Sequence, residues 1–336
     1  MITDQSNSSE ANKIHKSHND DKPFLSLDQQ VELLRSRGLI IKDKQSAKDI
    51  LEASNYYRFS GYSLTLREDD HFFLGVTFED IADIYDFDQA LRSLLLHYLQ
   101  IIEVRVKSVY AYEFAQMYGP KGYTDPANFK SGTTAQDLEN LLEKPNEMRE
   151  KRLPDELFLK RYEDVEQLPI WVFIEMFTFG GLSKIFAAST DELKVAVSKH
   201  FIKDYMLRKN YQSTNNVSYF KRNLLCLTIL RNFCAHGSRL FNRVFSTKPA
   251  LSKPERKFLS KDNNGHHLYG YQYSTPDNSH LYGFIIVMKR LLRDSDFEAM
   301  KSNVIALENK YPKIDMGYYG FPKDWESTIS DCTDSQ

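Results

Sequence analysis

The residues of this chain best suited to chemistry are Arg231, Asn232 and His236, which lie close together in the sequence. A histidine titrates near neutral pH, so it can take or give a proton. An arginine presents a planar fork of N–H donors that matches phosphate oxygens, and an asparagine can orient either neighbour. This combination is typical of a site that acts on a phosphodiester bond.

Spacing alone is weak evidence for such a site. An arginine followed four to six positions later by a histidine occurs by chance on the order of once in a chain of this composition. Arg92 and His97 show the same spacing, but they lie on the leucine-rich face of a long predicted helix. The copy at 231–236 is favoured by its context, because an asparagine follows the arginine, a glycine follows the histidine, and Arg239 lies just beyond.

The element that must position this copy is an apolar helix predicted over 223–239. Leu224, Leu227 and Cys234 recur at helical spacing. Gly237 lies where many helices end in a left-handed residue. We therefore expect the polar residues to lie at a rigid yet reachable helix end. The alternative is a surface helix end whose arginine and histidine only cap backbone carbonyls.

A second helix is expected to bring an acidic residue to the same place. Apolar residues recur at alternating threes and fours from Thr77 to Tyr118, which predicts a helix of about 40 residues. Glu103, near its middle, is the candidate to hold Arg231 or to orient His236. The alternative for Glu103 is a solvated charged face.

A further candidate for RNA contact is the run Tyr56, Tyr57 and Arg58. Aromatic rings stack on bases, and an arginine between them can hold phosphate. The alternative is an aromatic knuckle that packs two helices together.

Composition limits the class of protein. The chain has 336 residues, of which 41% are hydrophobic, so it can build a substantial core. The net charge is −2, so nothing in the overall charge indicates nucleic-acid binding, and any RNA site must be a local patch. The three cysteines, Cys226, Cys234 and Cys332, form neither a disulfide framework nor a metal set, and the first two are expected in the core. A reducing, cytoplasmic location fits this usage.

The pattern predicts an all-α protein with one helical domain over 23–310. Residues 1–22 are polar and expected to be disordered, with no apolar segment of a signal peptide. Residues 119–168 are charged and proline-containing, which favours an insertion or arm, and 311–336 form a tail that packs back before a polar end. No apolar run reaches the roughly 18 residues of a membrane span.

Three smaller expectations complete the pattern. Residues 71–76 are expected to form a loop or a short strand pair with residues 64–66. Residues 168–186 read as a core helix with a break permitted at Gly180-Gly181. His266 and His267 are not at a metal-binding spacing, so we expect neither a metal nor another cofactor.

Taken together and in order, several stretches resemble the Abi-like proteins of the AbiD/AbiF abortive-infection type over about residues 25–310. The motif Arg-Asn-x-x-x-His is also similar to the RNA-cleaving motif of the HEPN superfamily, found in type VI CRISPR effector nucleases. The stretches are Asn55 to Tyr62, Ile84 to Asp88 with Leu91-Arg92, Ile102 to Arg105, Leu168 to Trp171 with Phe179-Gly180, and Arg231 to His236.

This resemblance implies a HEPN-like helical bundle that acts in bacterial anti-phage defence. It implies a metal-independent endoribonuclease that cuts single-stranded RNA and leaves a 2′,3′-cyclic phosphate. Arg231 and His236 match the catalytic pair, Asn232 the intervening polar position, and Glu103 the acid of a preceding helix, with Arg239 in support. A single convincing motif favours a homodimer, and some relatives are associated with a small regulatory RNA.

Two alternative functions remain open at this point. One is a helical module that binds RNA and signals without cutting it. The other is a scaffold that senses a phage component and has no RNA site. The nearly neutral overall charge favours the scaffold, whereas the polar helix end argues against it.

Overall fold

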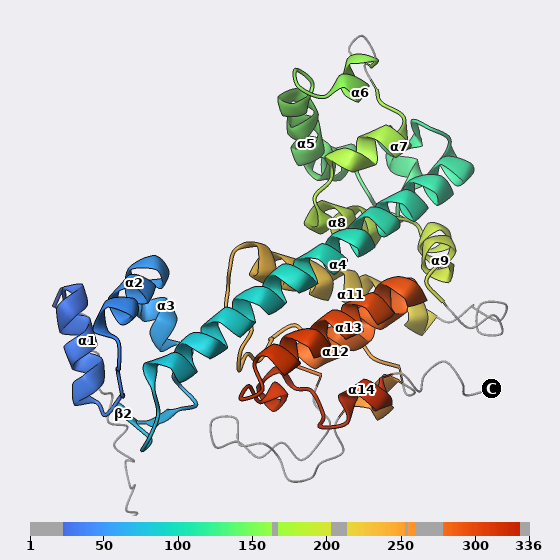
Figure 1. Ribbon diagram of the computed structural model, residues 1–336. Coiled ribbons are helices and arrows are strands. Elements are labelled where there is room, and N and C mark those ends of the chain that lie inside the picture. Colours follow the sequence, from blue (N-terminus) through green and yellow to red (C-terminus); the bar gives the residue numbers. More distant parts are fainter. Residues whose placement is uncertain (1–22, 163–166, 203–213, 253–254, 260–277, 330–336) are drawn as a thin grey trace, which may run out of the picture. The chain divides into compact units, whose positions relative to one another are not determined.

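The computed structural model in Figure 1 is built almost entirely of helices in the ranges that it describes, with one two-stranded ribbon. The all-α prediction is therefore confirmed. The chain divides into two compact units, 1–82 and 83–336, and the division falls inside the long helix α4 (Phe78–Tyr118). The predicted domain 23–310 contains this division. The described residues are 23–162, 167–202, 214–252, 255–259 and 278–329.

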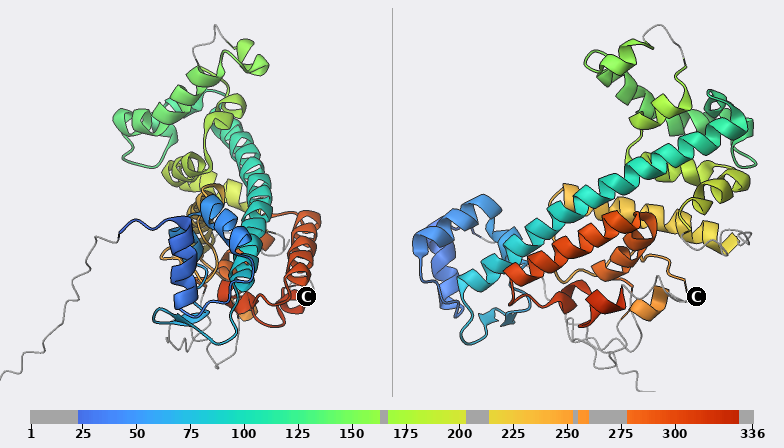
Figure 2. Two further views of the ribbon diagram at one scale, coloured as in Figure 1. Left: turned by 60° about the vertical axis from the view of Figure 1, so that its left-hand side comes forward. Right: turned by 45° about the vertical axis from the view of Figure 1, so that its right-hand side comes forward.

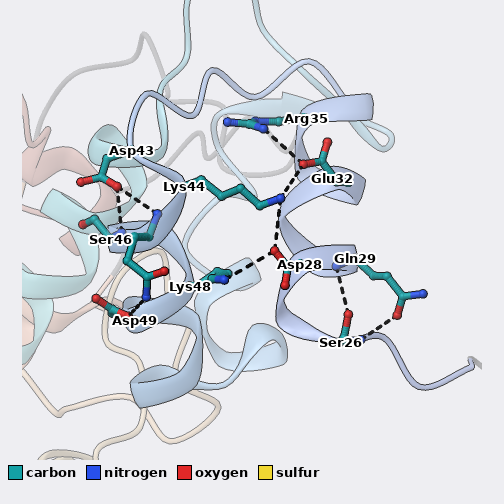
Figure 3. Close-up of polar contacts among 11 residues, drawn as sticks. Ser26, Asp28, Gln29, Glu32, Arg35, Asp43, Lys44, Ser46, Lys48 and Asp49 are labelled. Carbon is teal, nitrogen blue, oxygen red and sulfur yellow. Dashed lines mark hydrogen bonds and ion pairs between the residues drawn. The ribbon is translucent and has the colours of Figure 1, made fainter.

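The first unit is held by a small core and by charged contacts between its first two helices. Its elements are α1 (Leu27–Ser36), α2 (Lys44–Ser54), α3 (Tyr56–Ser60), β1 (Arg67–Glu68), β2 (His71–Phe72) and the first turn of α4. Figure 3 shows the Lys44 ammonium between Asp28 and Glu32 of α1, at 3.1 and 3.2 Å from their carboxylate oxygens. These ion pairs are exposed and stabilise the unit little. Phe59 is buried and stacks on Phe78, with ring centroids 4.6 Å apart.

The predicted strand pair exists but was placed a few residues wrongly. Arg67 pairs with Phe72 and Glu68 with His71, instead of the expected 64–66 with 71–76. Asp69 adopts a positive φ of 51°, which makes a tight turn and pairs the residues nearest to it.

The second unit is built around α11 (Thr214–Ala235), against which α8, α9 and α12 pack. α13 runs beside the part of α4 that belongs to this unit, and Asn303 donates a hydrogen bond of 3.0 Å to the Tyr98 hydroxyl (Figures 1 and 2). The remaining elements are η1 (Gly122–Thr124), η2 (Pro126–Asn128), α5 (Ala135–Arg152), α6 (Leu157–Lys160), α7 (Ile170–Phe173), η3 (Ile174–Met176), α8 (Phe179–Ala188), α9 (Asp191–Lys199), η4 (Glu255–Phe258), α12 (Leu281–Leu291), α13 (Asp294–Lys310), η5 (Met316–Tyr319) and α14 (Trp325–Thr328).

The expected charged arm contains a regular helix, α5, which packs against η3 and α8. Thr134 and Asp137 form a capping box at its start, and Leu138, Leu142 and Pro145 form its buried face. Pro145 lies inside the helix. A proline inside a helix removes one backbone hydrogen bond, and here the apolar spacing and the cap outweigh that loss.

The apolar stretch 168–186 breaks before the two glycines and not at them. α7 ends at Phe173, η3 follows it and ends at Met176, and α8 starts at Phe179. The Thr178 hydroxyl accepts a hydrogen bond from the Gly181 N–H at 3.1 Å, so an N-cap defines the break. The glycines serve close packing, since a Cβ on Gly180 would lie 3.4 Å from the Thr228 methyl.

The C-terminal segment packs back onto the second unit, as expected. Tyr319 is fully buried, and Phe321 and Trp325 are nearly so. No helix within the described ranges has an apolar stretch long enough to cross a membrane.

Candidate functional site

The candidate site lies where α11 ends, and the main chain itself completes that end. Gly237 adopts φ +66°, and its N–H donates to the Cys234 carbonyl at 3.3 Å. The Ser238 N–H donates to the Phe233 carbonyl at 2.8 Å. These two bonds around a left-handed glycine are the Schellman arrangement. The predicted glycine stop is confirmed, although α11 begins earlier than expected, at Thr214.

The side chains at this helix end do not act as caps. Within the described part of the chain, Arg231, Asn232 and His236 form no side-chain hydrogen bond or ion pair. Asn232 and His236 are exposed, whereas Arg231 is half-buried and its Nε is a buried donor without an acceptor. A buried donor without a partner is rare in native proteins and costs about 1–3 kcal/mol. The structure therefore does not support the alternative in which these residues only cap carbonyls.

Arg231 and His236 are near in sequence but are not brought together in one chain. Five positions correspond to about 140° around a helix of 3.6 residues per turn, so the two side chains leave α11 on different sides. Neither bonds to the other among the described residues. Asn232 lies between them and is exposed.

Glu103 is engaged with a neighbour on its own helix. Its carboxylate lies 3.3 Å from the Lys107 ammonium, which lies 3.9 Å from Glu175. The Glu103 side chain is only 12% exposed, so it is not part of a solvated charged face. No ion pair joins it to Arg231 among the described residues.

Asp88 is a positioning residue that the sequence reading missed. It is fully buried on α4 and accepts hydrogen bonds from the Leu240 N–H at 3.2 Å and the Phe241 N–H at 2.8 Å. The Tyr319 hydroxyl donates to it at 3.1 Å, and Arg92 forms an ion pair with it. One carboxylate thus fixes the chain just after the candidate helix end.

This arrangement also accounts for the arginine of the second Arg–His copy. The Arg92 guanidinium is buried and paired with Asp88, so it is not available to a substrate. His97 is exposed, and its ring lies against that of Tyr98. The sequence signal for the Asp88–Arg92 pair was present as an acid four positions before an arginine, but this pattern is common on helix surfaces.

Residues 238–252, called here the return segment, are bonded to α11. The buried Asn223 side chain donates to the Ala250 carbonyl at 2.9 Å and accepts from its N–H at 2.8 Å. Nearer the helix end, the Arg243 Nε donates to the Arg239 carbonyl at 2.7 Å, and its guanidinium lies 4.6 Å from the Phe233 ring centroid. Arg239 is half-buried in this segment.

The aromatic run lies on α3 in the first unit. Tyr57 is 88% exposed, while the Tyr56 hydroxyl accepts a hydrogen bond from Arg37 at 3.3 Å, and Arg58 is exposed. Phe59, the next residue, provides the buried packing. Packing therefore accounts for Phe59 and Tyr56, and Tyr57 remains open to a ligand.

The family profile described as Abi-like protein matches residues 49–242, which is more than half of the chain. The chain belongs to the Abi-like protein family. It is thus a bacterial abortive-infection protein, and the matched part of this Abi-like protein includes Asp88, Arg92 and the whole of 231–239. Searches of the curated proteins and of the solved structures gave no match.

The two described cysteines of this Abi-like protein are core residues, as predicted. Burial raises the pKa of the Cys226 thiol to about 11 and that of Cys234 to about 12. Neither is a nucleophile near neutral pH.

No group of three or more His, Cys, Asp or Glu side chains is arranged to hold a metal ion within the part of the Abi-like protein that the structure describes. His266 and His267, which were considered for a metal from the sequence, lie outside the described residues.

Proposed function

We propose that this abortive-infection protein is a metal-independent endoribonuclease of the HEPN type that acts on single-stranded RNA. The observation that carries the proposal is the state of the α11 end. The main chain satisfies the carbonyls of residues 232–234, and the side chains of Arg231, Asn232 and His236 form no bond among the described residues, so their hydrogen-bonding groups remain for a ligand. The terminal N–H groups of Arg231 form no bond among the described residues, and phosphate oxygens can accept hydrogen bonds from them.

The proposed reaction uses the 2′-hydroxyl of the RNA. His236 takes the proton from this hydroxyl as its oxygen attacks phosphorus. The bond from phosphorus to the 5′-oxygen breaks, that oxygen takes a proton, and a 2′,3′-cyclic phosphate remains. Arg231 neutralises the charge that develops on the phosphorane, and Asn232 orients the histidine or the phosphate. DNA lacks the nucleophile and is not cut.

The proposed active assembly is a homodimer in which two α11 ends meet. The side chains of Arg231 and His236 leave one helix about 140° apart, so a second copy can supply the group that the first does not present. Mixing Arg231→Ala protein with His236→Ala protein tests this. Mixed dimers with one complete composite site are expected to regain cleavage that neither variant shows alone. If both variants stay inactive after subunit exchange, the composite site is wrong.

A matched pair of labelled RNA and DNA strands of the same sequence, incubated with the protein in EDTA, tests the reaction itself. We expect cleavage of the RNA only, unaffected by the chelator. Cleavage of the DNA, or loss of RNA cleavage in EDTA, would refute the mechanism. Binding of both strands without cleavage of either would favour the non-catalytic RNA-binding function.

A further inference from the structure

A long part of this chain around α11 contains no acidic residue. About one residue in seven of the whole chain is Asp or Glu, since there are 46 among 336. Yet none occurs between Asp204 and Glu255. α8, which packs against α11, also has none. The nearly neutral overall charge therefore hides a basic region, which lies at the candidate site.

The exposed side of α11 forms a continuous strip that leads to His236. Ser218, Lys221, Leu225, Asn232 and His236 are all exposed, and their spacing of three, four and seven places them on one helix face. Leu225 is 45% exposed, so an apolar side chain lies open within this polar strip. From Lys221 to His236 the strip extends about 22 Å at 1.5 Å per residue.

One basic group beside this strip, Arg222, is bonded to the return segment, and two others, Arg243 and Lys248, belong to it. Arg222, also exposed, donates from its Nε to the Lys248 carbonyl at 3.0 Å. Lys221, Arg222 and the exposed Lys248 therefore gather at the end of the strip remote from His236. The Arg243 guanidinium, held over Phe233, lies nearer the other end.

We infer that this strip, with Lys221 and Arg222 at its far end, binds the phosphate backbone of the RNA strand that is cut at His236. The inference rests on the proposed function and adds where the strand lies. Backbone phosphates are bound by positive charge, and α8, α11 and the return segment supply lysines and arginines with no acidic residue among them, whereas α9, which also packs on α11, begins with Asp191 and Glu192. The open Leu225 side chain gives a base an apolar surface between the phosphates.

The test uses the double variant Lys221→Gln and Arg222→Gln in a His236→Ala background, so that RNA stays intact. Each contact to a single-stranded phosphate contributes about 0.7 to the slope of log affinity against log salt. Losing two contacts should lower that slope by about 1.4 and weaken binding about 20-fold at 0.1 M salt. The matched control is Lys144→Gln with Lys151→Gln, two exposed lysines on α5, which should change neither quantity.

The outcomes separate this inference from the proposed function. An unchanged salt slope in the α11 variant would refute the binding strip, whether or not the wild type cuts RNA. If the α11 variant lowers the salt slope but the wild type never cuts RNA, the nuclease function is wrong and the strip is an RNA-binding surface only. If the double variant fails to fold, the single variant Lys221→Gln replaces it, because the Lys221 side chain supports no fold contact among the described residues. This variant should lower the salt slope by about 0.7.

Discussion

Replacing Asp88 by Asn should destabilise the second unit more than any surface change, because it removes a charge at the centre of a buried network. Asp88 is fully buried and Arg92 is 5% exposed. The variant keeps nearly the same side-chain volume, so packing changes little. It leaves the Arg92 guanidinium buried without its counter-charge and weakens the bonds from the Leu240 and Phe241 N–H groups.

The expected loss in free energy of unfolding is about 3–5 kcal/mol, which is typical when one partner of a buried ion pair is removed. A unit of this size loses about 2–4 °C of melting temperature for each kcal/mol. We therefore expect a decrease of about 10 °C. Asp86→Asn, two positions away and exposed, is the matched control and should stay near the wild type.

Urea unfolding of wild type, Asp88→Asn, Arg92→Met and the double variant measures the pair directly. Removing both charges should cost less than the sum of the two single losses, with a coupling of about 1–3 kcal/mol. If the unfolding free energy of Asp88→Asn lies within about 1 kcal/mol of the wild type, or if the two losses simply add, the buried pair does not hold the return segment in place.

Three other changes probe the same region. Asn223→Ala removes both hydrogen bonds to the Ala250 peptide, so we expect urea unfolding to show a free energy of unfolding lower by about 2–3 kcal/mol. A much smaller decrease would mean that Asn223 does not hold the return segment. Gly237→Ala places a residue with a Cβ at φ +66°, so thermal unfolding should show a stability lower by about 1–2 kcal/mol. An unchanged stability would mean that residue 237 is not left-handed in solution. Burial raises the thiol pKa of Cys226 to about 11 and of Cys234 to about 12, so the unfolded chain, with thiols near 9.0, ionises first. Stability should therefore fall as pH rises from about 9 towards 11, and alkylation of Cys226 and Cys234 at pH 8.5, located by peptide mass spectrometry, should occur only on denaturation.

Features set by local sequence could be predicted. The start of α4 after Thr77 and the glycine stop at Gly237 each depend on residues within a few positions. Such signals act through short-range hydrogen bonds and backbone preferences, which do not need the rest of the fold.

Features set by distant contacts could not be predicted. The partners of Asp88 are Leu240, Phe241 and Tyr319, which lie 152, 153 and 231 positions further along the chain. The sequence around Asp88 therefore shows only an ordinary helix pair with Arg92. Glu103 was expected to hold Arg231 or to orient His236, but it pairs with Lys107, four positions along the same helix. The excess of basic residues around α11 is not visible in the total charge of the chain, because acidic residues elsewhere cancel its positive charge.

The most direct test of the central claim compares three purified proteins on one labelled single-stranded RNA in EDTA: wild type, His236→Ala and His97→Ala. The last removes the exposed histidine of the rejected Arg–His copy. We predict that wild type and His97→Ala cut the RNA and leave a 2′,3′-cyclic phosphate, while His236→Ala does not cut. Equal cutting by His236→Ala and wild type would contradict the assignment of the site.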